Sequence, residues 1–171
     1  QDDAQVFCRA DQVKDEVTKI WTIVNTFYQA FNFDLWVRLS FHDPKTPEKY
    51  LGGEAVWQKA EQELRDIAAS QGITFKEVPG EAAFYGPKLD FIAKDAIGRE
   101  LQVATIQLDM NMPERFDLSC VNEEGEKERI VMIHAAVMGS LERFMAVLIE
   151  HLAGRFPLWL APVQIKLLPI A

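Results

Sequence analysis

Cysteine is scarce in this sequence, and long apolar runs, internal repeats and low-complexity tracts are absent. The two cysteines, Cys8 and Cys120, form no metal-binding spacing, so we expect two reduced, mostly buried thiols in a cytoplasmic protein, with a single disulfide as the alternative. The longest apolar stretch, 144–152, is interrupted by Glu150 and His151 and falls short of the roughly 20 residues that span a bilayer. No membrane partner and no signal peptide are expected.

Positive charge is also in short supply. Lysine and arginine number 18 against 26 aspartates and glutamates, which gives a net charge of −8. A general nucleic-acid-binding protein usually carries a basic face, so the charge argues against that class, while local RNA contact by a few basic side chains stays open. The length of 171 residues is enough for one domain with a core of its own.

The hydrophobic pattern mixes two periods. Apolar residues at helical spacing predict helices over 11–30, with Asp11 as the N-cap, over 54–71 and over 140–152. Alternating or continuous apolar stretches predict strands, and a turn over 95–98 predicts a hairpin. These strands are expected at 34–39, 73–78, 88–94, 100–108, 117–121, 129–134 and 163–170. The fold class is therefore α+β, with a largely antiparallel sheet flanked by helices.

Polar residues gather around the predicted hairpin. Tyr85 and Lys88 precede a strand and suit a small charged ligand, although a surface turn with a Lys88–Asp90 ion pair is the simpler alternative. Thr105 and Gln107 share one face of the next strand because side chains alternate with period two. Together with Gln102, a residue of the same strand, they indicate either a polar pocket or a solvated face.

Three further positions carry chemistry. Asp2 and Asp3 can accept from an ammonium or hydroxyl group, or simply be solvated. His134 closes an apolar strand, where one histidine is more often a core or edge residue than a metal ligand, since a zinc site needs three or four ligands. Ser140 can cap a helix whose first turn holds Arg143, and a guanidinium there either binds a phosphate or stacks on a purine, or forms a surface ion pair.

Together these segments resemble the catalytic domain of the threonyl-tRNA synthetase family, a group of class II aminoacyl-tRNA synthetases. The similarity runs nearly from end to end. The most specific segments, in chain order, are QDDAQVFCRADQ, FYGPKLDFIAKDAIGR, TIQLDMNMPERFDL, VMIHAAVMGSLERF and LAGRFPLWLAPVQI. The fourth of these segments contains GSLERF, which resembles the family's motif 3. The resemblance implies a class II antiparallel sheet, activation of threonine by ATP to an adenylate, and transfer of the amino acid to tRNA(Thr).

The resemblance also implies roles for individual residues. Arg143 would stack on the adenine and act with Lys88 as a catalytic residue, and Gln102 and Ser140 would lie along the ATP. Threonine would bind to Gln1, Asp3, Tyr85, Thr105 and Gln107. Mg²⁺ would bridge the phosphates, and the full-length protein would be a cytoplasmic homodimer.

The chain departs from the family at the metal site. Family members hold zinc with one Cys and two His; His134 matches one ligand, but Gln5 stands at the position of the second, and a glutamine oxygen is a poor zinc ligand. Ala135 and Val103 replace a usual Arg and Cys. Zinc is therefore not expected in this chain and stays open for its parent. These changes motivate the alternative of a catalytically inactive, synthetase-like paralogue that binds ligand or RNA or has a regulatory role.

The chain begins with Gln1 and lacks the family's motif 1 and most of motif 2, so we interpret it as a fragment that is inactive alone. Residues 1–156 would be a partial class II catalytic domain, incomplete at its N-terminus. Residues 157–162 would be a linker, and 163–171 the start of a C-terminal anticodon-binding domain.

Overall fold

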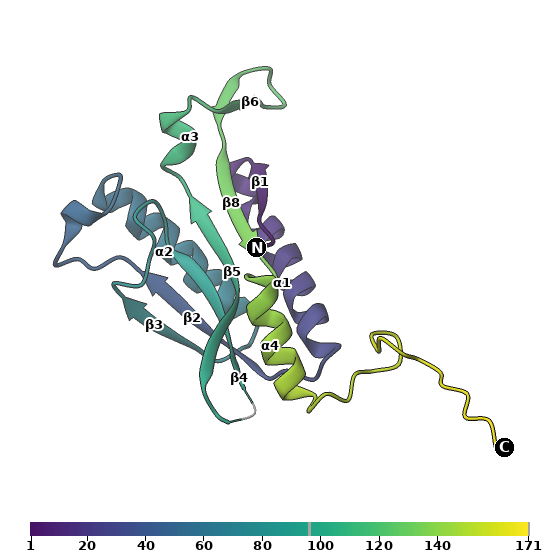
Figure 1. The fold of residues 1–171 in the computed structure, drawn as a ribbon. Coiled ribbons are helices and arrows are strands. Elements are labelled where there is room, and N and C mark those ends of the chain that lie inside the picture. Colours follow the sequence, from purple (N-terminus) through teal and green to yellow (C-terminus); the bar gives the residue numbers. More distant parts are fainter. Residues whose placement is uncertain (96, 171) are drawn as a thin grey trace.

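A six-stranded sheet forms the centre of the computed structural model, which describes residues 1–95 and 97–170 (Figure 1). Its strand order is β1-β8-β5-β4-β2-β3, and neighbouring strands are antiparallel except for the parallel β2–β3 pair. The strands are β1 (Ala4–Cys8), β2 (Leu35–Phe41), β3 (Phe75–Pro79), β4 (Lys88–Lys94), β5 (Glu100–Asp109) and β8 (Val131–Ala136). The predicted α+β class and largely antiparallel sheet are confirmed.

Helices and a small hairpin complete the fold. The hairpin pairs β6 (Ser119–Val121) with β7 (Lys127–Arg129). The helices are α1 (Val13–Gln29), α2 (Glu54–Ser70), α3 (Met112–Arg115) and α4 (Leu141–His151), with single 3-10 turns at Ala10–Gln12 and Pro47–Lys49. None of the helices in the described ranges is long and apolar enough to cross a membrane.

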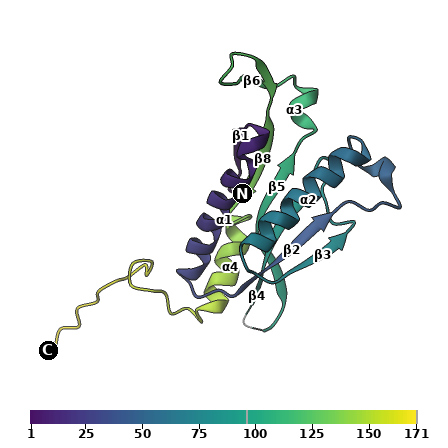
Figure 2. The same ribbon diagram turned by 180° about the vertical axis from the view of Figure 1, so that it is seen from behind.

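The core lies between one face of the sheet and two helices. Helices α1 and α2 lie over this face (Figures 1 and 2), and their apolar residues pack into the core. On the strands, alternate residues such as Leu39, Leu89 and Ile106 point into this core and are fully buried. Because side chains alternate along a strand, the residues between them must face the opposite side.

Helix α4 begins as the sequence predicts. The Ser140 hydroxyl caps it by accepting from the Arg143 backbone N–H at 3.3 Å. The apolar side of α4 meets the end of α1, where the Phe144 ring packs against Phe27 and Tyr28. The cap and this contact together fix where the first turn of α4 lies relative to the sheet.

Some boundaries differ from the sequence predictions. Asp11 is not the N-cap of α1, because a 3-10 turn holds Asp11 and Gln12 is the residue that flanks the helix. The strand predicted at 129–134 is divided at Ile130 between β7 and β8. The hairpin turn predicted over 95–98 includes Ala96, which lies outside the described residues, as does Ala171.

The strand predicted at 163–170, as the start of a further domain, stays a prediction. This segment is extended but pairs with no strand of the described chain, and it leads away from the sheet (Figure 1). Its apolar side chains are open to solvent, with Leu167 89% and Ile170 99% exposed. A strand needs a hydrogen-bonding neighbour, and apolar composition alone does not provide one.

Candidate functional site

Two rows of polar side chains cross the face of the sheet that α1 and α2 leave uncovered. The rows follow the pairing register from strand to strand. The first row runs Ser40, Lys88, Gln107, His134 and Gln5 on β2, β4, β5, β8 and β1. The second row, two residues along each strand, runs Arg38, Asp90, Thr105 and Ala136. Five segments that are distant in sequence thus place their polar residues on one surface.

A β-bulge brings Gln102 to the same surface. Phe91 pairs with Ala104 but Ile92 pairs with Gln102, so Val103 is an extra residue in β5. An extra residue reverses the alternation beyond it and re-aims the side chains. Gln102 and Thr105, three residues apart, therefore lie on one face, which strict period-two alternation does not allow.

The bulge is tied to the core by a buried tyrosine. The Tyr28 hydroxyl of α1 lies 3.0 Å from the Val103 carbonyl oxygen and 2.8 Å from that of Val137, just after β8. Burial raises the pKa of the Tyr28 phenol, so it keeps the proton that it donates to these carbonyls. One side chain thus links the bulge to the segment that leads into α4.

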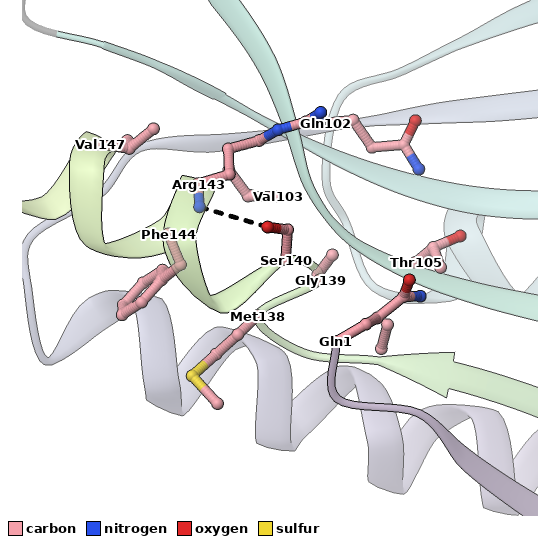
Figure 3. A pocket seen from close by; sticks show the side chains of 12 residues that line it. Gln1, Gln102, Val103, Thr105, Met138, Gly139, Ser140, Arg143, Phe144 and Val147 are labelled. Carbon is pink, nitrogen blue, oxygen red and sulfur yellow. Dashed lines mark hydrogen bonds between the residues drawn. The ribbon is translucent and has the colours of Figure 1, made fainter.

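A cavity of about 270 Å³ opens where the bulge faces the start of α4 (Figure 3). Its polar lining residues are Gln1, Gln102, Thr105, Ser140 and Arg143. Figure 3 shows the Arg143 side chain extending from α4 toward β5, the strand that carries Gln102 and Thr105. A guanidinium beside amide and hydroxyl groups suits a ligand that is polar and negatively charged.

Asp90 is the centre of a hydrogen-bond network beside this cavity. Its side chain is fully buried, and its Oδ1 accepts from Gln102 Nε2 at 2.9 Å and from Thr105 Oγ1 at 2.8 Å. Its Oδ2 accepts from Ser40 Oγ at 2.6 Å and Arg38 Nη2 at 3.1 Å. Lys88 Nζ lies 3.4 Å from Oδ2, so the Lys88–Asp90 ion pair is present, and binding of a charged ligand by Lys88 stays a prediction.

A second cluster surrounds Gln107 in the first row. The Tyr85 hydroxyl donates to Gln107 Oε1 at 3.0 Å, while Gln107 Nε2 donates to the Gly86 carbonyl at 3.2 Å. Burial raises the pKa of the Tyr85 phenol, and the carboxylates of Asp109 and Asp3 raise it further, so Tyr85 stays a donor at neutral pH. The Tyr85 ring meets that of His134 edge-on at 5.4 Å.

The residues at the position of the family's zinc site do not fit that ion. His134 Nε2 lies 3.0 Å from Asp109 Oδ2, and Gln5, opposite His134 in the ladder, donates its Nε2 to Asp3 Oδ1 at 3.2 Å. Within 1–95 and 97–170 no group of three or more His, Cys, Asp or Glu is placed to hold a metal. A single imidazole engaged with a carboxylate is an incomplete donor set for zinc.

The structure therefore divides the predicted site residues into two neighbouring groups. Gln1, Gln102, Thr105, Ser140 and Arg143 line the cavity. Asp3, Tyr85, Lys88, Gln107 and His134 do not line it but lie next to it along the same polar face.

Sequence reasoning missed Arg38 and the supporting roles of Asp90 and Asp2. Arg38 and Asp90 hold the network, and the only signal for them is a charged residue inside each of two apolar strands, LWVRLSF and KLDFIAK. Asp2 is half-buried, and its carboxylate accepts from the backbone N–H groups of Val137, at 2.6 Å, and Met138, at 3.1 Å. It thereby holds the turn that precedes α4.

Comparison with known proteins identifies this arrangement. The class II core domain of tRNA synthetases (G, H, P, S and T) matches residues 1–152. The chain belongs to this family. The resemblance described from the sequence is thus confirmed. The sheet that carries the two polar rows is a class II synthetase sheet.

The relatives found by sequence are threonine–tRNA ligases. That of Phocaeicola vulgatus is 52% identical over the whole chain, and that of Chlorobaculum tepidum is 51% identical. A crystal structure described as the RNA-binding domain of threonyl-tRNA synthetase from Cryptosporidium parvum aligns with 95% of this chain and 40% of its own, at a TM-score of 0.88 and 39% identity. The chain spans 27% of the length of the first relative and 26% of the second.

Proposed function

We propose that the chain is part of a threonine–tRNA ligase, which activates threonine with ATP to threonyl-adenylate and transfers it to tRNA(Thr). The observation that carries the proposal is the convergence of Gln1, Gln102, Thr105, Ser140 and Arg143 on one cavity. These residues come from the chain start, β5 and the α4 start, and all except Gln102 belong to the segments that resemble the family. The identity of 52% to a threonine–tRNA ligase over the whole chain supports the same substrate.

The proposed chemistry needs positioning and charge rather than a protein nucleophile. The threonine carboxylate attacks the α-phosphorus of ATP, pyrophosphate leaves, and the enzyme stabilises the charge that develops. Arg143 would bind the nucleotide from α4, with Gln102 and Ser140 along it. The residues that would bind threonine are Gln1, Asp3, Tyr85, Thr105 and Gln107. Lys88 would add positive charge between these residues and those that bind the nucleotide.

The metal and protein partners follow from the same proposal. The cavity lining holds no carboxylate within the described ranges, so Mg²⁺ would be held by the ATP phosphates and water rather than by a protein cage. The full-length protein would be a cytoplasmic homodimer. Residues 1–156 would be its partial catalytic domain, 157–162 a linker and 163–171 the start of an anticodon-binding domain, and the chain alone would be inactive.

The test is threonine-dependent ATP–pyrophosphate exchange by the full-length protein. We expect exchange in the parent and a loss of at least 100-fold in kcat/KM for Arg143→Ala, because removal of a group that stabilises developing charge costs on that order. Arg155→Ala is the matched control, since Arg155 is exposed and does not line the cavity. Absence of exchange in a folded, ATP-binding parent would refute the ligase and favour the inactive paralogue.

A further inference from the structure

Asp90 determines which hydrogen-bonding groups the cavity presents. A threonine hydroxyl carries one proton, and that of Thr105 is donated to Asp90 Oδ1 at 2.8 Å. A carboxylate can only accept, so the direction of this bond is fixed. Toward the cavity, Thr105 Oγ1 therefore offers only lone pairs. It can accept from a hydroxyl or ammonium group of a ligand but cannot donate to one.

The same carboxylate fixes the amide of Gln102. Gln102 Nε2 donates to Asp90 Oδ1 at 2.9 Å, and Gln102 Oε1 accepts from Arg38 Nη2 at 3.0 Å. Rotating the amide by 180° would set its NH₂ group against a guanidinium and its oxygen against a carboxylate. Both contacts would then be repulsive, so the Gln102 amide has one orientation only.

Asp90 also holds two cations beside the cavity. Arg38 and Lys88 approach its Oδ2 at 3.1 Å and 3.4 Å from neighbouring strands. Without the carboxylate these two positive groups would repel each other in a buried position. Asp90 itself does not line the cavity, so any effect on a ligand passes through the side chains that it holds.

We propose that Asp90 is a positioning residue that sets the hydrogen-bond polarity of Gln102 and Thr105 and thereby the affinity of the cavity for its substrate. The ligand group at Thr105 is a hydrogen-bond donor, either a sugar hydroxyl of the nucleotide or the ammonium of the amino acid. This inference rests on the proposed function for the identity of the substrates. The contacts of Asp90 stand without it.

The test compares Asp90→Asn with the parent in the full-length protein. Asparagine has nearly the same shape, but its NH₂ group must face a side chain that now donates to Asp90. We expect the dissociation constant of the substrate whose donor contacts Thr105, measured by calorimetry with Mg²⁺, to rise about tenfold, because loss of a charge-assisted hydrogen bond has that effect. Separate titrations with ATP and with threonine show which substrate supplies the donor at Thr105.

Two controls separate positioning from simple loss of stability. Asp95→Asn is matched, because the Asp95 side chain is also fully buried and paired with an arginine, Arg99, but does not line the cavity. We expect its effect on either dissociation constant to stay within twofold. The combined effect of the double variant Asp90→Asn/Gln102→Leu should be smaller than the product of the two single effects, since Asp90 acts in part through Gln102.

Several outcomes would overturn the inference. These are dissociation constants of Asp90→Asn within twofold of the parent, multiplicative effects in the double variant, or a parent that binds neither substrate. If Asp90→Asn does not fold, Ser40→Ala decides, because it removes the 2.6 Å bond to Asp90 without touching the cavity. An unchanged affinity in Ser40→Ala would reject the role. A parent that binds ATP but catalyses no exchange would reject the proposed function alone.

Discussion

Replacing Tyr28 by Phe tests whether one buried hydroxyl holds the bulge in place. The hydroxyl lies within hydrogen-bonding distance of two carbonyls, and its single proton is shared between them. The net value of such a bond is about 1 kcal/mol, and a buried carbonyl left without a partner adds about 1 kcal/mol. The expected loss in the free energy of unfolding is therefore about 2 kcal/mol.

The assay is urea unfolding of the 171-residue chain, supported by thermal unfolding, where this loss corresponds to a fall in melting temperature of about 6 °C. Tyr50→Phe is the matched control. The Tyr50 ring packs against His42 and Trp57, but its hydroxyl has no hydrogen-bond partner in the described ranges. A loss below about 0.5 kcal/mol for Tyr28→Phe, equal to that of the control, would refute the reasoning.

Three further predictions concern the site and its surroundings. Gly86→Ala should lower the free energy of unfolding by at least about 3 kcal/mol, because the added Cβ would lie 1.7 Å from the Leu108 carbonyl oxygen. Gly53→Ala is the control and should change it little, since a Cβ there meets nothing within 4 Å. Equal losses for the two variants in urea unfolding would contradict this. Burial raises the pKa of the Cys8 thiol to about 11, so its alkylation should be slow at pH 8 and become faster as the pH rises toward that value. The more exposed Cys120 should react first, and equal labelling of the two cysteines at pH 8 in mass spectrometry would contradict this prediction. In the full-length protein Gln5→His should raise the zinc content measured by elemental analysis, because imidazole is a far better zinc ligand than an amide oxygen. An unchanged zinc content would show that Gln5 is not what weakens zinc binding.

Most of the fold could be predicted because its signals are local. The periodicity of α1 and α2 and the serine cap of α4 each depend on residues within a few turns of one another. The strand predicted at 163–170 is a different case, since its formation depends on a hydrogen-bonding partner that the described residues do not supply. The parallel pairing of β2 with β3 is likewise a matter of register between distant segments, which composition does not encode.

The candidate site shows the same limit. Thr105 and Gln107 could be placed on one face by alternation alone. Gln102 could not, because its direction depends on the extra residue Val103 and on the distant Tyr28. Arg38 and Asp90 were missed as a pair because they lie on different strands, and only the sheet register brings them together.

The row Ser40, Lys88, Gln107, His134 and Gln5 makes the polar face a reporter of correct assembly. Four separate strand pairings join its five members. A slip by one residue in any of these pairings would turn that strand's contribution toward the helices and bury it. A chain with a slipped strand would therefore lose this polar face before it lost its secondary structure, so binding of the proposed substrates would be a stricter test of refolding than circular dichroism.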